Sequence, residues 1–452
     1  MHSPSPEEAR LVADRSAGRL GDLGAGVEIV AATPGDHPEA LALLAQTQQA
    51  QLAEDFQSRL DEPGYSPADR LLIRRRGQLV GHVRSSRHIA WFSGQRIPVG
   101  RIDDLALLPE YAAAGYDDAL LATAEESAAR EGALVLTAFA ADAAPFRRRG
   151  WSRVRGQGHT RARTRAVLAH LDALQEHRRR RRRAEAEVRA WRLVDLDAIE
   201  QIFARMAPAT WGALLRSPET WRWLAGRKVH DAILLALQGG RRNGGDDVAD
   251  DLPTPPEQVV GYAVLRDSQV IEMFTDPARP AAATALLAQA CRDAIDRGHH
   301  FVSLHTPADD PLHELIVTAG GGWAAHPAEG QWMTKLAAPD RWVDRMYPVL
   351  RERAVAAGID RPAEIAMRVG DAVRALVLTR RSARLEHRNA DESSPFPCSA
   401  VTEQDLLLGN LSLSRGLHDR LLPELAPETA RLVAGLLPAR QFWQSPWELL
   451  RL

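Results

Sequence analysis

The stretch Leu105-Ala-Leu-Leu-Pro-Glu-Tyr-Ala-Ala-Ala-Gly-Tyr-Asp-Asp-Ala-Leu-Leu121 decides the fold of this chain. Its apolar start is typical of a strand, which ends at Pro109 because proline cannot donate a ladder hydrogen bond. Small residues at 112–115 then predict a turn, and residues 116–131 carry alanine and leucine at helical spacing. Backbone N–H groups at a helix N terminus attract anions. We therefore predict an anion-binding turn between a strand and a helix.

Around this stretch the hydrophobic pattern predicts a mixed α/β domain that begins near Val27. Strand-like runs precede the turn, and a buried strand follows the helix, which gives the order strand, helix, strand. The predicted strands are residues 27–32, 70–74, 79–92, 97–108 and 133–139, and the predicted helices are residues 38–51 and 116–131.

The same pattern recurs later in the chain. The segment QLVGHV at 78–83 returns as QVVGYAV at 258–264, and RRRGW at 147–151 returns as GGGW at 320–323. Self-similarity of this kind indicates an internal duplication. We predict an α/β (α+β) fold with two tandem mixed sheets and flanking helices, followed by a smaller α+β domain. The predicted segments are an irregular N-terminus at 1–26, a first unit at 27–164, an Arg-rich helical linker at 165–187, a second unit at 188–338 and the last domain at 339–452.

Composition and charge exclude several classes of protein. Lys and Arg number 57 against 59 Asp and Glu, a formal charge of −2, so no global basic field would hold nucleic acid or an anionic membrane. The arginine run at 178–183 lacks interleaved aromatic residues, which favours a solvated linker over a nucleic-acid contact. Cys291 and Cys398 are too few for a thiolate metal site or a disulfide framework. We predict a cytoplasmic protein without metal, nucleic-acid or membrane partners.

The strand–turn–helix layout resembles the GNAT superfamily of acetyltransferases, whose loop Gln/Arg-x-x-Gly-x-Gly/Ala binds the pyrophosphate of coenzyme A. Gly115 matches the central glycine of that loop. Ala112 stands in place of Gln or Arg, and Asp117 stands in place of Gly or Ala. A carboxylate at a helix N terminus competes for the partial positive charge that would hold a phosphate. Both departures predict weaker pyrophosphate binding.

Two such units followed by an α+β tail resemble the enhanced intracellular survival family of acetyltransferases, whose last domain resembles sterol carrier proteins. In that family the second unit has lost its cofactor loop, and residues 277–285 here contain no glycine. The resemblance implies acetyl-CoA as the donor and a homo-oligomer. It also implies a set of cofactor-binding residues along the strand, the turn and the following strand end, namely Leu105, Ala106, Leu107, Ala113, Ala114, Gly115, Tyr116, Asp117, Asp118, Ala141 and Asp142.

The catalytic groups follow less directly. The family's general acid is a tyrosine, and the matching position in Pro145-Phe-Arg-Arg-Arg-Gly-Trp151 is Phe146. The family's general base is the C-terminal carboxylate, which by position is that of Leu452. Asp103 and Asp104, on the strand before the turn, are further candidates for a base or an amine-binding group, with a solvated or salt-bridged role as the alternative.

These residues support two hypotheses of different classes. The first is an N-acyltransferase that moves the acetyl group of acetyl-CoA to an amine of a small molecule or peptide. The second is an inactive homologue that serves as a ligand-binding or interaction scaffold, because Ala112, Asp117 and Phe146 all depart from the family pattern.

Overall fold

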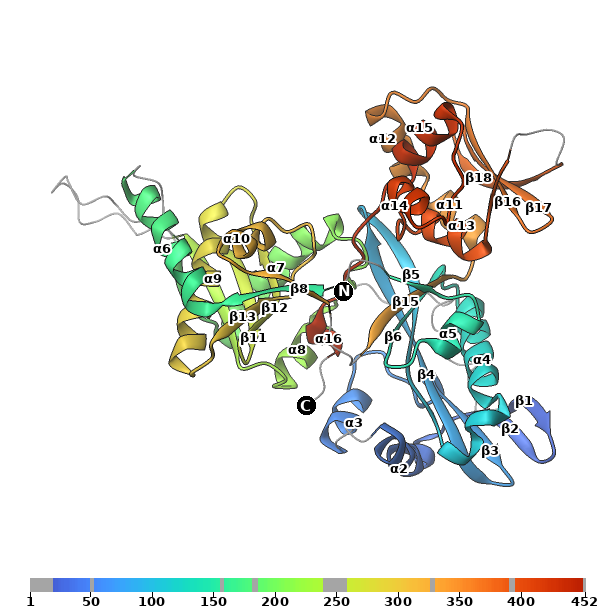
Figure 1. The fold of residues 1–452 in the computed structure, drawn as a ribbon. Helices are drawn as coiled ribbons and strands as arrows, with labels where there is room; N and C mark the ends of the chain where they lie inside the picture. Colours follow the sequence, from blue (N-terminus) through green and yellow to red (C-terminus); the bar gives the residue numbers. More distant parts are fainter. Residues whose placement is uncertain are drawn as a thin grey trace. The chain divides into compact units, whose positions relative to one another are not determined.

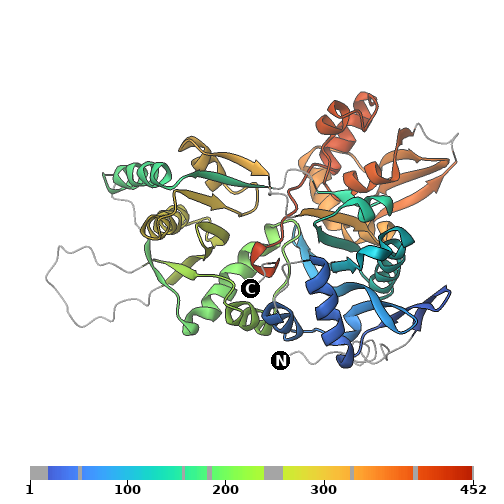
Figure 2. The same ribbon diagram turned by 60° about the horizontal axis from the view of Figure 1, so that its bottom comes forward.

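The computed structural model describes residues 19–48, 53–154, 158–180, 186–238, 258–325, 330–389 and 395–449. The chain forms two compact units, of which one comprises residues 1–155 and 328–442 and the other comprises residues 156–327 and 443–452. Their described strands form sheets of eight, seven and four strands, with helices packed on them (Figures 1 and 2). The predicted mixed α/β class is confirmed, including the separate sheet near the C-terminus.

The first sheet has the strand order β1-β2-β3-β4-β5-β6-β15-β7. Neighbouring strands are antiparallel except β5 and β6, which are parallel. The strands are β1 (Arg19–Gly24), β2 (Val27–Ala31), β3 (Arg70–Arg75), β4 (Gln78–Phe92), β5 (Gln95–Leu107), β6 (Val135–Ala140), β7 (Ser152–Arg153) and β15 (Gln331–Leu336). The helices are η1 (Pro34–Asp36), α2 (His37–Gln48), α3 (Ala53–Leu60), η2 (Pro67–Asp69), η3 (Pro109–Ala114), α4 (Tyr116–Arg130) and α5 (Ala144–Arg148).

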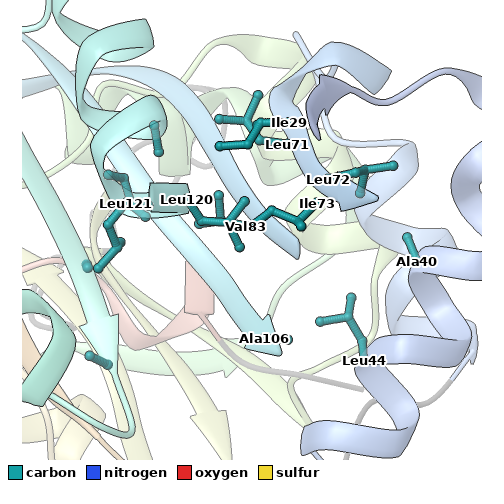
Figure 3. Packing of buried hydrophobic residues seen from close by; sticks show 14 of the residues in the cluster. Ile29, Ala40, Leu44, Leu71, Leu72, Ile73, Val83, Ala106, Leu120 and Leu121 are labelled. Atoms are coloured by element: carbon teal, nitrogen blue, oxygen red, sulfur yellow. The ribbon is translucent and has the colours of Figure 1, made fainter. Parts of the chain in front are cut away.

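Both faces of this sheet are covered, so successive residues of its central strands are buried although they point to opposite faces. Figure 3 shows Ala40 and Leu44 of α2 on one side of the strands and Leu120 and Leu121 of α4 on the other. All four side chains are fully buried. The turn that leads into α4 is therefore attached to a rigid core.

One predicted irregular segment is partly a strand. Residues 19–24 form β1, which pairs with β2 in an antiparallel hairpin. The composition of RLGDLG suggested no strand, yet the backbone hydrogen bonds of a ladder need no apolar side chain, and the segment stays mostly exposed. Residues 1–18 lie outside the described part of the chain.

The second sheet has the order β14-β8-β13-β12-β11-β10-β9. Its elements are β8 (Gly158–Arg163), α6 (Thr164–Arg180), β9 (Glu187–Ala190), η4 (Leu193–Asp195), α7 (Leu196–Met206), η5 (Ala207–Ala209), α8 (Pro218–Gly226), β10 (Ala232–Gln238), β11 (Gln258–Arg266), β12 (Gln269–Thr275), α9 (Pro280–Asp296), β13 (Phe301–Leu304), α10 (Leu312–Thr318) and β14 (Gly322–Ala325). From β9 to β14 these elements follow the order of the first sheet from β2 to β7, as the predicted duplication requires. Within α6, which falls in the predicted linker, Val167 and Leu171 are buried in the core of this unit.

The two sheets exchange a strand, which the contiguous boundaries at 164 and 338 did not anticipate. β15 lies within the predicted second unit, 188–338, but pairs with β6 and β7 of the first sheet. β8 lies within the predicted first unit, 27–164, but pairs with β13 and β14 of the second sheet. Each sheet therefore needs chain from both halves of the duplication.

The C-terminal domain has a four-stranded sheet with the order β18-β17-β16-β19. Its elements are α11 (Pro339–Arg345), α12 (Tyr347–Ala356), β16 (Ala363–Val369), β17 (Ala372–Leu378), β18 (Ala383–Arg388), β19 (Phe396–Cys398), α13 (Ala400–Leu407), α14 (Leu413–His418) and α15 (Pro427–Leu436). After this domain the chain returns to the second unit, where α16 (Pro446–Leu449) packs against β12. The likeness of the domain to sterol carrier proteins stays a prediction.

Candidate functional site

The candidate site is the place where β5 and β6 separate. The two parallel strands are in register only at Val99 to Arg101, opposite Val135 to Thr137. β5 continues to Leu107 and β6 to Ala140, but no further pairs join them in the described residues. Leu105, Ala106 and Leu107 therefore lie on the edge of β5 that has left its neighbour. Ala141 and Asp142 directly follow β6.

The glycine turn adjoins the end of β5. Residues 109–114 form η3, and Gly115 then has a φ of 72°, a left-handed conformation that favours glycine. A Cβ at Gly115 would meet no atom within 4 Å, so the turn is open. No side chain in the described structure caps the start of α4. Ala113 and Ala114 are exposed beside it.

Two carboxylates share this turn with an arginine. Arg148 of α5 forms an ion pair with Asp117 and lies 3.4 Å from the carboxylate of Asp118. Its side chain is half exposed. Backbone N–H groups at a helix N terminus attract anions, whereas two carboxylates at the same place repel them.

The neighbouring Arg149 has a structural role instead. Its guanidinium binds both oxygens of Glu125 at 3.0 and 2.9 Å. The same carboxylate accepts from the Trp151 indole at 2.7 Å and from Lys335 at 2.8 Å. These bonds tie α4 to β15.

Phe146, which the sequence analysis matched to the family's tyrosine, belongs to the core. Its ring is buried and meets Trp151 edge to face with centroids 5.1 Å apart. A phenyl ring carries no proton to donate, so no general acid stands at this position.

Asp103 and Asp104 lie at a bulge in β5. The ladder with β4 shifts between the pairs His82–Ala106 and Arg84–Asp103. Asp104 has a φ of 54°, and it is the one described non-glycine residue with positive φ inside a strand, since the others lie in turns or after helices. Such strain persists only where the surroundings impose it, and it concentrates at functional sites.

Both carboxylates are ion-paired. Arg101 donates to Asp103 at 2.8 Å, and Asp104 lies 3.8 Å from the guanidinium of Arg70. The salt-bridged alternative for these residues is therefore what the structure shows. Their use as a base stays a prediction.

The sequence analysis missed a layer of buried polar residues on the α2 face of the sheet. It includes Arg70, His82 and Arg84, all nearly inaccessible. Although burial alone would raise it, the pKa of Glu62 is held far below its usual range by Arg84, 2.5 Å away, and by Arg101. The signal in the sequence was the presence of polar residues at every second position of one strand, His82, Arg84, Ser86 and His88, which places them on one face.

The remaining predicted groups are less informative. Leu452 lies outside the described residues. Among the described residues no three His, Cys, Asp or Glu side chains are grouped so as to hold a metal ion. Likewise, no described helix is long and apolar enough to cross a membrane.

A mixed sheet with splayed parallel strands, a glycine turn and a following helix defines the acetyltransferase class of α/β fold. Residues 28–154 match the family model of the acetyltransferase (GNAT) domain. The part of the chain from β2 to β7 is therefore a GNAT domain. A search of curated proteins found no match to the chain.

Solved structures extend the similarity of fold to most of the chain. A GCN5-related N-acetyltransferase from Anabaena variabilis is 14% identical, with a TM-score of 0.65 over 92% of this chain and 99% of its own. Eis1 from Mycobacterium abscessus is 16% identical, with a TM-score of 0.59 over 92% and 99% of the two chains. A third, from Kribbella flavida, is 17% identical, with a TM-score of 0.62 over 92% and 97%. The predicted resemblance thus holds for the fold beyond the first unit.

Proposed function

We propose that this protein is a GNAT-type N-acyltransferase that transfers the acetyl group of acetyl-CoA to an amine of a small molecule or peptide. The observation that carries the proposal is the splay of β5 from β6 next to the open turn at Gly115. A splay exposes a strand edge for the amides of pantetheine, and the turn offers backbone N–H groups to the pyrophosphate.

In this proposal the chemistry belongs to the first unit. Leu105, Ala106 and Leu107 bind pantetheine, the turn from Ala113 to Asp118 faces the pyrophosphate, and Ala141 and Asp142 lie beside the thioester. The amine nitrogen attacks the thioester carbonyl carbon, the carbon–sulfur bond breaks, and the sulfur leaves as a thiolate. The proton of the amine passes to a base, for which Asp103, Asp104 and the Leu452 carboxylate are the candidates.

Phe146 limits the rate in this proposal. General acid–base catalysis typically contributes a factor of roughly 10² to 10⁴, and the buried phenyl ring supplies none of it. Transfer should therefore be slow unless another proton donor substitutes, for which water, Tyr116 and His159 are the candidates. The homo-oligomer stays a prediction from the resemblance, and the cytoplasmic location stays a prediction from the composition.

The second candidate function is an inactive scaffold, and one specific observation favours it. Asp117 and Asp118 stand at the proposed pyrophosphate site, and both are paired with Arg148. The site thereby already holds negative charge with its own counter-ion.

Calorimetric titration with acetyl-CoA distinguishes the two. We expect micromolar binding by the wild-type protein. Since a carboxylate at a helix N terminus weakens anion binding by about 0.3 to 1 kcal/mol, Asp117→Gly should bind roughly two- to fivefold more tightly. Asp172→Asn is the control, because Asp172 of α6 also pairs with an arginine, Arg292 of α9, but lies outside the GNAT domain. No wild-type binding with rescue by Asp117→Gly would support the scaffold, and no binding by either protein would overturn the transferase.

A further inference from the structure

The bulge in β5 is held by a side chain from the neighbouring strand. His82 Nδ1 lies 2.8 Å from the backbone carbonyl oxygen of Asp104, and His82 Nε2 lies 3.0 Å from Arg70 Nη1. A guanidinium only donates, so Nε2 must accept and the proton must sit on Nδ1. His82 therefore donates to the Asp104 carbonyl in a tautomer that Arg70 determines.

Arg70 closes this arrangement into a ring. The same Nη1 atom lies 3.8 Å from the Asp104 carboxylate, so Arg70 contacts the bulge residue directly as well as through His82. Arg70 is held in turn, because its Nε donates to the Tyr65 hydroxyl at 3.2 Å and its guanidinium lies 4.3 Å from the centre of the Phe56 ring. The Tyr65 hydroxyl also contacts His37 Nε2 at 2.8 Å.

Holding the carbonyl of Asp104 also orients the next amide. In a planar trans peptide the C=O of one residue and the N–H of the next point in opposite directions. With the Asp104 carbonyl turned to His82, the Leu105 N–H is directed to the opposite side of the strand. Leu105 begins the edge that the proposed function assigns to the acyl-CoA.

The second unit provides an internal comparison. Gly81 pairs with Leu107 in the first unit, and Gly261 pairs with Thr275 at the corresponding place in the second. The residue after each glycine is His82 in one case and Tyr262 in the other. The second ladder is regular beside Tyr262, and its irregularity lies further along, after Val264.

Tyr262, which stands in place of His82, also has a different hydrogen-bond partner. The Tyr262 hydroxyl donates to Glu272 at 2.6 Å, and no described residue of β12 has a positive φ. The unit without a glycine turn therefore has no bulge beside this position and no histidine there. The bulge in β5, the histidine that holds it and the glycine turn thus occur together in the first unit, as expected if they serve one site.

We infer that His82 and Arg70 are positioning residues of the transferase site, which lock the Asp104–Leu105 peptide so that its amide faces the carbonyl of the bound thioester. This inference rests on the proposed function. It predicts that these two residues affect the binding of the acyl group of the donor and not the binding of its nucleotide part.

The test compares acetyl-CoA with coenzyme A, which lacks the thioester carbonyl. We expect His82→Phe, which keeps a ring but removes both nitrogens, to weaken acetyl-CoA binding about tenfold, the loss expected for one hydrogen bond of about 1.4 kcal/mol, while coenzyme A binding stays within about twofold. The NMR shift of an isotopically labelled thioester carbonyl should move toward its value in free acetyl-CoA. His82→Asn, whose amide can still donate to Asp104, should restore both readouts.

Tyr262→Phe is the matched control, because it removes a buried hydrogen bond from the corresponding position of the second unit without changing the site. It should leave both affinities unchanged. Unaltered discrimination between the two ligands in His82→Phe would overturn the inference while leaving the proposed function intact. If His82→Phe does not fold, Arg70→Met carries the same expectation. Absence of binding of either ligand to the wild type would overturn the proposed function and the inference together.

Discussion

At the scale of single residues, the burial of His82 links stability to pH. Burial and the nearby Arg70 lower the pKa of His82 to about 4, whereas an exposed histidine titrates near 6.5. Between these values the unfolded chain binds more protons than the native one. The free energy of unfolding of the first unit should therefore fall as the pH drops from about 6.5 to about 4, by up to about 1.4 kcal/mol per pH unit.

Denaturant titrations at several pH values measure this loss. His82→Asn removes the titrating group and should show a smaller dependence on pH than the wild type. Equal slopes in the two proteins would show that other groups carry the acid sensitivity.

At the scale of elements, the packing of α4 on the sheet depends on Gly100. A Cβ at this position in β5 would stand 2.7 Å from the Ala128 Cβ of α4 and 2.9 Å from a methyl group of Leu136 on β6. Overpacking of this kind typically costs about 1 to 3 kcal/mol. We expect Gly100→Ala to lower the thermal midpoint and to displace α4, which carries the turn.

The control for this change is Gly226→Ala. Gly226 ends α8 in the second unit, and no atom lies within 4 Å of a Cβ built there. Alanine is the better helix former, so this variant should be as stable as the wild type or more so. If the thermal midpoint of Gly100→Ala equals that of the wild type, the packing of α4 on β5 can adjust to the added methyl group.

At the scale of the whole molecule, the exchanged strand makes the first sheet depend on a distant part of the chain. A fragment ending at Val154 lacks β15 and leaves the edge of β6 unpaired. It also loses Trp332, whose ring packs edge to face on Phe139. We expect this fragment to aggregate or unfold, since exposed strand edges are prone to aggregate. Co-expression with residues 328–442 should restore a soluble complex, and a stable, monomeric fragment alone would contradict the expectation.

The return of the chain to the second unit depends on a buried ion pair. Arg216 binds both oxygens of Glu272 at 2.8 and 2.6 Å and donates to Glu448 of α16 at 2.7 Å. Removing one member of a buried pair typically costs about 3 to 5 kcal/mol, because the remaining charge stays buried. Arg216→Met should show this loss in chemical unfolding of the second unit. Glu448→Gln keeps an acceptor oxygen and should cost much less; equal losses would contradict this account.

Much of the candidate site could be predicted from the sequence. The strand, the glycine turn and the helix are local, so the run from Leu105 to Leu121 was enough to place them. The ion pair between Asp117 and Arg148 could not be predicted, because it joins residues that are distant in sequence. The hydrogen bond between His82 and the Asp104 carbonyl could not be predicted either, because it depends on which residue of β4 lies opposite the bulge. That is set by the register of the ladder.

The sequence by itself determined the mixed α/β class, the duplication and the position of the glycine turn between β5 and α4, since hydrophobic period and turn chemistry act over a few neighbouring residues. Only the tertiary structure decided that β15 joins the first sheet and β8 the second, that β1 extends the first sheet and that α16 returns to the second unit. Those choices depend on strand edges and buried charges meeting across long separations in sequence. A local pattern shows that a strand forms, but the partner of that strand is selected by the assembled core.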